Sequence, residues 1–215
     1  FTAPPEATLE WNDAAVEGSY RFLRRVWAFG HRQADALRAA TAADLSNASL
    51  RPEARKLRRE MHLVLKQVSY DYERMQYNTV VSGCMKLLNA LDDFAFDDSP
   101  GDAAVRCEGM SLLVRMLYPA CPHITHALWI ELGYGPDILQ ASWPEPLEEA
   151  LVQDEQELVL QVNGKHRGSV RVKVGADKTA IEAAALANEA AQKFMEGKPA
   201  KKVIVVPGRL VNIVV

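Results

Sequence analysis

The first two thirds of the chain carry apolar residues at every third or fourth position, with polar residues between them. This spacing is typical of helices that bury one face and leave the other in water. A helical pattern starts at Trp11, and one face of it carries Val26 and Phe29. Asn12 or Asp13 can cap its start. The pattern predicts helices from Trp11, over 50–76, over 80–94, over 102–118 and over 122–132. Four or five such helices with short connections predict an antiparallel bundle.

After residue 154 the period of the apolar residues changes to two, which is typical of strands. Residues 158–162 alternate between apolar and polar, Asn163-Gly164 is a hairpin turn signal, and 170–174 alternate again. An alanine-rich helix and two apolar strands complete the pattern, over 178–196, 203–206 and 210–214. These elements predict a small ββαββ domain, so the fold class of the whole chain is α+β.

The register of the predicted hairpin requires an irregularity. A two-residue turn at 163–164 puts Val170 and Val172 on the face opposite to Leu160. One extra residue in the return strand restores a common apolar face, and Gly168 is the natural site for such a bulge. The bulge predicts an irregular hairpin tip that displays to solvent Lys165, His166 and Arg167.

Proline content and the change of period divide the chain into four parts. Residues 1–9 contain prolines and no periodicity, so they are interpreted as a connector. Residues 10–133 form the helical bundle. Residues 134–153 hold three prolines and are predicted to be a linker. Residues 154–215 form the small domain.

Composition excludes several classes of protein. With 215 residues, of which 48% are hydrophobic and 25% charged, the chain has ordinary globular composition and is not disordered. No apolar run approaches the roughly 20 residues of a membrane-spanning helix. Three cysteines do not make a disulfide scaffold, which indicates a reducing compartment. The start at Phe1, without a basic and apolar leader, indicates a piece of a longer protein rather than a secreted one.

The charge is distributed unevenly along the chain. Through residue 157 there are 15 Lys and Arg against 24 Asp and Glu, a balance of −9, whereas residues 158–215 have 10 against 4, a balance of +6. A basic module of this kind favours a polyanionic partner over a surface that is merely soluble. A second positive cluster opens the helix predicted over 50–76, where a plain solvated helix face is an equally good interpretation.

No residues assemble into a catalytic or metal site. Cys121, His123 and His126 have metal-ligand chemistry, but a fourth ligand is missing nearby and their neighbours are apolar, so helix packing is favoured. Cysteines in apolar helical contexts are usually small buried hydrophobes. Neither a nucleophile elbow nor a phosphate-binding glycine loop is present. We therefore predict no catalytic residues and no metal ligands.

Several strings resemble one family along nearly the entire chain. APPEATLEWNDAAVEGSYRFLRRVW and MHLVLKQVSYDYERMQYNTVVSGCMKLLNALDDF are similar to the segment after the catalytic core and to the long helices of the class Ia anticodon-binding bundle. LYPACPHITHALWIELG is similar to a later helix of that bundle. QVNGKHRGSVRV and KKVIVVPGRLVNIVV resemble the C-terminal domain of bacterial leucyl-tRNA synthetases, which other class Ia enzymes lack.

The resemblance implies a parent enzyme, a leucine–tRNA ligase of the cytoplasm, that activates leucine with ATP and Mg²⁺ and edits mischarged tRNA in a separate domain. The adenylate-forming HIGH and KMSKS motifs of the family are absent here. The chain itself is therefore expected to need no cofactor and to catalyse neither step. Its expected partners are leucine-acceptor tRNA and the remainder of the synthetase, as a monomer without membrane attachment.

The resemblance also implies which residues contact the tRNA. The bundle would lie along the stem and the small domain would grip the outer corner, where the D and T loops meet. The residues assigned to these contacts are Asn163, Lys165, His166, Arg167, Lys198, Lys201, Lys202 and, on the bundle, Arg55, Lys56, Arg58 and Arg59. The linker at 134–153 would let the small domain swing with the tRNA. The alternative is a structural scaffold of the synthetase with little RNA binding of its own.

Overall fold

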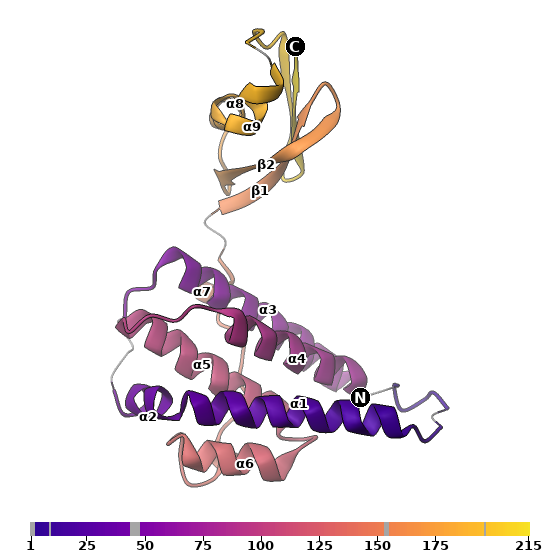
Figure 1. Ribbon diagram of the computed structural model, residues 1–215, viewed down its shortest axis with the longest axis vertical. Helices are drawn as coiled ribbons and strands as arrows, with labels where there is room; N and C mark the ends of the chain where they lie inside the picture. Colours follow the sequence, from indigo (N-terminus) through magenta and orange to yellow (C-terminus); the bar gives the residue numbers. More distant parts are fainter. Residues whose placement is uncertain (1–2, 9, 44–47, 153–154, 196) are drawn as a thin grey trace. The chain divides into compact units, whose positions relative to one another are not determined.

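The computed structural model describes residues 3–8, 10–43, 48–152, 155–195 and 197–215. Helix and sheet are both present, and the chain divides into two compact units, Phe1–Leu151 and Val152–Val215 (Figure 1). The first unit is helical and the second carries a four-stranded sheet. No helix in the described ranges combines the length and the apolar character needed to cross a membrane.

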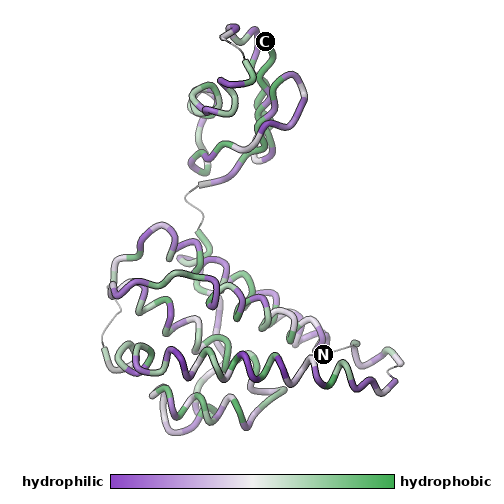
Figure 2. Tube along the Cα trace, in the orientation of Figure 1, coloured by the Kyte–Doolittle hydropathy of each residue, from purple (hydrophilic) through white to green (hydrophobic). Residues whose placement is uncertain are grey.

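The helical unit is built on three long helices that pack against one another: α3, α4 and α5. Its elements are α1 (Asp13–Arg32), α2 (Ala34–Ala42), α3 (Pro52–Glu73), α4 (Tyr77–Asp93), α5 (Pro100–Leu117), α6 (Pro122–Glu131), the 3-10 turn η1 (Ile138–Gln140) and α7 (Glu148–Leu151). Asn12, one of the two capping residues that the sequence offered, caps α1 by accepting a hydrogen bond from the Ala15 backbone N–H. Apolar and polar positions are interleaved along these helices (Figure 2).

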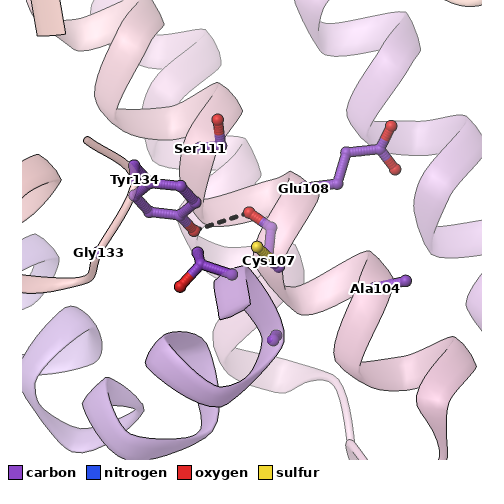
Figure 3. A pocket seen from close by; sticks show the side chains of 8 residues that line it. Ala104, Cys107, Glu108, Ser111, Gly133 and Tyr134 are labelled. Atoms are coloured by element: carbon purple, nitrogen blue, oxygen red, sulfur yellow. Dashed lines mark hydrogen bonds between the residues drawn. The ribbon is translucent and has the colours of Figure 1, made fainter. Parts of the chain in front are cut away.

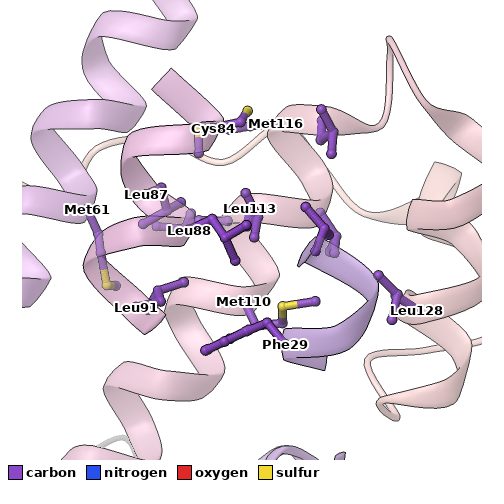
Figure 4. Packing of buried hydrophobic residues seen from close by; sticks show 14 of the residues in the cluster. Phe29, Met61, Cys84, Leu87, Leu88, Leu91, Met110, Leu113, Met116 and Leu128 are labelled. Atoms are coloured by element: carbon purple, nitrogen blue, oxygen red, sulfur yellow. The ribbon is translucent and has the colours of Figure 1, made fainter. Parts of the chain in front are cut away.

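Helix α5 lies at the centre of this unit and is buried on most of its circumference. Met110, Leu113 and Met116 meet Leu88 and other residues of α4 in the core, which Figure 4 shows from close by. Gly109 permits the close approach of the neighbouring helix, since a Cβ there would lie 2.5 Å from a methyl group of Leu91. Burial of this kind stabilises a fold by about 25 cal/mol for each Å² of apolar surface.

The sequence pattern predicts one helix from Trp11 and does not separate α2 from it. In the structure α1 ends at Arg32 and α2 begins at Ala34, with Gln33 between them. Leu37 and Ala40 of α2 are buried, so this short helix contributes to the core although it is mostly made of alanine. Part of the polar stretch that follows, 44–47, lies outside the described residues.

Residues 134–151, which we call the strap, pack onto the helices, and this corrects the predicted linker over 134–153. Ile138 is buried, and Tyr134 stacks on the Trp129 ring at 4.9 Å between centroids. Trp143 packs edge-on against Tyr72 and donates its indole N–H to Ser69 Oγ at 3.0 Å. The prolines shape a segment that belongs to the first unit, so 134–151 provides no swinging hinge.

The second unit is a mixed sheet covered by helices on one face. Its elements are β1 (Glu155–Val162), β2 (Lys165–Lys173), α8 (Lys178–Ala187), α9 (Glu189–Met195), β3 (Lys202–Val206) and β4 (Leu210–Val214). The strand order is β2-β1-β4-β3, with β1 and β4 parallel and the outer pairs antiparallel. The apolar face of the sheet beneath the helices carries Leu158, Leu160, Val211 and Ile213. Ile181 of α8 belongs to the same core.

The predicted single helix over 178–196 is two helices in the structure. Asn188 ends α8 in an extended conformation, and its side-chain oxygen accepts a hydrogen bond from the Ala190 backbone N–H at the start of α9. Its amide donates to the Ser169 carbonyl on β2 at 3.1 Å. An asparagine competes with the helix for backbone partners, and here that competition bends the chain over the sheet.

The predicted bulge in the hairpin is confirmed. Val162 pairs with Lys165 and Gln161 with His166, but Leu160 pairs with Gly168, so Arg167 is the extra residue. Gly168 has a φ of +129°, a conformation that favours glycine. Leu158 then faces Val170, and both side chains are buried.

Candidate nucleic-acid interface

The hairpin tip is held rigidly against strand β4. Asn163 and Gly164 both have left-handed backbone conformations, with φ of +51° and +75°. The Asn163 N–H donates to the Ile213 carbonyl at 2.8 Å, and its side-chain oxygen accepts from the Val215 N–H at 3.1 Å. Asn212 Oδ1 accepts from the Gly164 N–H at 3.0 Å. These bonds fix the direction in which the next residues leave the turn.

Asn163, which we predicted to contact RNA, thus has a structural role in the turn. Asn163→Ala removes the acceptor for Val215 and forces an alanine into a left-handed conformation, so we expect a loss of about 1–2 kcal/mol in the stability of the second unit. Asn163→Gly loses only the hydrogen bond and should cost about half as much. Denaturant unfolding measures both; equal stability of the three proteins would contradict this role.

Lys165 and His166 are exposed at the tip, as predicted, but Arg167 is not fully displayed to solvent. Its guanidinium carbon lies 3.9 Å from the centre of the Phe194 ring of α9. Its Nε is buried without a hydrogen-bond partner among the described residues. The bulge turns Arg167 toward the helix-covered face, which a count of alternating positions cannot detect.

Strand register brings a second group of basic residues to the same end of the sheet. Lys202 pairs with Val214, next to the pairing of Ile213 with Val162, and Val162 in turn pairs with Lys165. Three strand spacings separate β2 from β3, about 14 Å. Exposed basic side chains at this end, which we call the basic end, are Lys165, His166, Lys201 and Lys202, and exposed Lys198 lies just before β3.

On α3 all three of the predicted RNA-contacting arginines have partners within the chain. Arg58 Nε donates to Glu108 at 2.7 Å, and its Nη1 contacts Glu149 at 3.2 Å. Arg59 donates to the Leu151 carbonyl and Arg55 to the Leu50 carbonyl. Exposed Lys56 completes the cluster. The density of positive charge in this helix is therefore explained largely by attachment of the strap and of the loop before α3.

Glu108 of α5 is the centre of the strap attachment. His62 Nδ1 accepts from the Leu147 N–H at 3.2 Å, so its Nε2 carries the proton and donates to Glu108 at 3.0 Å. Burial disfavours the charge of Glu108, but hydrogen bonds from His62 and Arg58 outweigh it and hold the pKa of this carboxyl below its ordinary value. The charged form is the one the structure stabilises.

Two cavities formed by described residues of the helical unit show no catalytic arrangement. One, of about 390 Å³, lies between α2, α5 and the start of the strap; there Tyr134 donates its hydroxyl to the Cys107 carbonyl (Figure 3). Burial raises the pKa of Tyr134 and of the Cys107 thiol, so neither ionises near neutral pH. Another, of about 500 Å³, lies beside Trp143 and is lined partly by prolines.

The cysteine and histidines near the start of α6 do not converge on a metal position. Cys121 is the residue before α6, and its carbonyl accepts a hydrogen bond from the Thr125 hydroxyl. His126 lies 3.6 Å from Asp137 of the strap. Within the described ranges no group of three or more His, Cys, Asp or Glu side chains could hold a metal ion.

Comparison with known sequences places this arrangement among tRNA ligases. The family described as "Anticodon-binding domain of tRNA ligase" matches residues 54–182. Leucine–tRNA ligases of Leptothrix cholodnii, Acidovorax ebreus and an Azoarcus species are 65%, 62% and 60% identical over the full chain. The chain spans only 24%, 25% and 25% of the lengths of these relatives.

A solved structure agrees with the sequence comparison. The crystal structure of a LeuRS–tRNA–LeuAMS ternary complex from Agrobacterium radiobacter K84 aligns with a TM-score of 0.71 and 25% identity. The alignment covers 96% of this chain and 26% of that one. The alignment therefore includes residues of both the helical unit and the sheet unit.

Proposed function

Because the chain belongs to the family of anticodon-binding domains of tRNA ligases, we propose that it is the tRNA-docking portion of a leucyl-tRNA synthetase. On this proposal the helical unit is an antiparallel bundle of the class Ia anticodon-binding type and lies along the tRNA stem. The sheet unit grips the outer corner, where the D and T loops meet. The observation that carries the proposal is the basic end of the sheet, which gathers four exposed basic side chains.

The chemistry of such an enzyme belongs to the three quarters of its length that lie outside this chain. The whole synthetase joins leucine to ATP, releasing pyrophosphate, transfers the leucyl group from AMP to the tRNA, and hydrolyses mischarged tRNA in a separate domain. ATP and Mg²⁺ would bind there, since the described residues offer no cluster that fits a metal ion. We place the enzyme in the cytoplasm as a monomer.

The basic end suits a folded RNA for a physical reason. Lysines on a rigid turn and at the start of β3 span about 14 Å, so they can reach phosphates on two neighbouring backbone segments at once. Phosphate contacts supply affinity and orientation without reading sequence. The exposed loops of the RNA corner then supply unstacked bases and a particular shape.

Binding across a salt series tests the proposal. The 215-residue chain is titrated with leucine-acceptor tRNA and with an unrelated tRNA between about 50 and 200 mM salt. We expect tighter binding to the leucine acceptor and a log–log slope that corresponds to three or four released counterions, because the basic end holds four basic groups. Equal affinities, or no binding, would contradict docking by this chain.

A scaffold function is the second candidate, and α1 provides the observation that favours it. Val16, Tyr20 and Trp27 form an apolar stripe on one face of this helix, with exposed fractions of 47%, 61% and 39%, and Trp11 before it is 81% exposed. Such a stripe is typical of a surface that packs against another domain. If the chain binds neither tRNA yet is required to keep the complete synthetase folded, the scaffold function is the correct one.

A further inference from the structure

We propose that Arg167 and Phe194 together form a stacking platform for one unpaired nucleobase of the bound RNA. The proposal rests on the proposed tRNA docking and names a contact within it. Phe194 lies on α9, outside the basic strings of the sequence, and is a positioning residue in this scheme. Arg167 is the residue that touches the base.

The Arg167 guanidinium stacks on the Phe194 ring. The guanidinium carbon lies 3.9 Å from the centre of the ring, which is stacking distance. A guanidinium is planar and has two faces, so a ring on one face leaves the other for a second planar group. Phe194 is itself 39% exposed, and the stack therefore reaches the surface of the unit.

The Arg167 guanidinium has no acidic partner among the described residues. Among the described residues Arg167 makes no ion pair, in contrast to Arg58 on α3. Its buried Nε also lacks a hydrogen-bond acceptor, which costs free energy in the unbound protein. Within the described residues the guanidinium therefore has the Phe194 ring as its neighbour and no carboxylate, which leaves its charge for an external partner.

The strand and the helix that carry Arg167 and Phe194 are held to each other. Gly168 follows Arg167 in the bulge, and Asn188 ties the α8–α9 junction to Ser169 of β2. Arg167 thus lies in the bulge of β2, next to the basic end, and α9, which carries Phe194, starts directly after a residue bonded to the same strand. A base that enters pays little to order the protein, which favours binding. A base is preferred over a phosphate because a phosphate needs charge alone and gains nothing from the ring.

Two substitutions separate stacking from charge. Arg167→Lys keeps the positive charge but loses the plane, and Phe194→Leu keeps apolar volume but loses the ring. We expect each to weaken binding of leucine-acceptor tRNA about tenfold, within the range found for loss of one stacked base. The salt slope should stay unchanged, because the number of phosphate contacts is the same. Phe194→Tyr, which restores a ring, should bind within about twofold of the unmodified chain.

Abasic substitutions in the D and T loops identify the base. Removal of the base at one position should weaken tRNA binding by the unmodified chain about tenfold. The same removal should not weaken binding by Phe194→Leu any further. If Arg167→Lys binds normally, or if every abasic tRNA weakens both proteins equally, the platform is wrong even though tRNA docking stands. If the unmodified chain binds no tRNA, the docking proposal fails and the platform with it. Unfolding curves for each variant show whether a loss of affinity reflects a loss of folding. Phe194→Tyr, which keeps an aromatic ring, is the comparison.

Discussion

Charge reversal at the hairpin tip, Lys165→Glu with Arg167→Glu, is expected to lower the affinity for leucine-acceptor tRNA by roughly a hundredfold near 100 mM salt. At Lys165 the change replaces a phosphate contact with a repulsive charge, and at Arg167 it removes the stacking guanidinium and adds a negative charge. About 1.4 kcal/mol for each gives two factors of ten. Charging by a complete synthetase that carries the same changes should fall in parallel. The log–log salt slope should also become shallower by about one unit, because Lys165 loses its phosphate contact.

The sheet unit offers a matched control for this experiment. Lys173 lies at the other end of β2, about 26 Å from the tip at roughly 3.3 Å per residue, and Lys178 opens α8. Lys173→Glu with Lys178→Glu makes the same change in net charge and should reduce affinity only a few-fold. If the control pair weakens binding as much as the tip pair, net charge and not the hairpin tip is responsible.

The sheet unit was largely predictable because its constraints are local in the sequence. Alternating apolar positions, a turn signal and the parity of Val170 relative to Leu160 were together sufficient to predict a bulge at Gly168, and the extra residue is Arg167, directly before it. The break at Asn188 was not predictable, since the alanine-rich segment around it is a good helix former. What bends the chain there is a hydrogen bond to Ser169, a residue on another strand.

The helical unit was harder to predict because its decisive contacts join distant residues. Arg58 is paired with Glu108 and Glu149, fifty and ninety-one positions away, and a positive cluster reveals no such partners. The strap was mistaken for a linker for the same reason: prolines indicate irregular backbone, and burial of Ile138 depends on the tertiary fold. Candidate RNA contacts at the basic end remain, whereas Arg58 and Arg59 are engaged within the unit.

Removal of the Glu108 carboxylate is the substitution expected to destabilise the helical unit most. Glu108→Ala leaves the buried Nε2–H of His62 without an acceptor and deprives Arg58 of its closest partner. Breaking a mostly buried charged network in this way costs about 3 kcal/mol. Glu149→Ala is the control, because Glu149 is 73% exposed and contacts the same arginine. It should cost less than about 1 kcal/mol.

In Glu108→Ala the strap should open locally before the helices unfold. The Leu147 N–H donates to His62, so its hydrogen exchange should become faster in Glu108→Ala and stay slow in Glu149→Ala. Equal exchange in both variants would mean that Glu108 does not hold the strap. A loss of stability without faster exchange at Leu147 would place the role of Glu108 in packing between α3 and α5.

The pH dependence of this difference follows from the charge of Glu108. Because its pKa in the folded protein lies below the ordinary value of about 4.3, the charged network contributes its full stability above that value. The contribution is lost as the pH falls through the lower pKa of the folded state. The unmodified chain should therefore be more stable than Glu108→Ala at neutral pH, and the gap should narrow below about pH 4 as Glu108 is protonated. A gap that stays constant down to pH 3 would mean that the side chain stabilises the strap by packing and not by its charge.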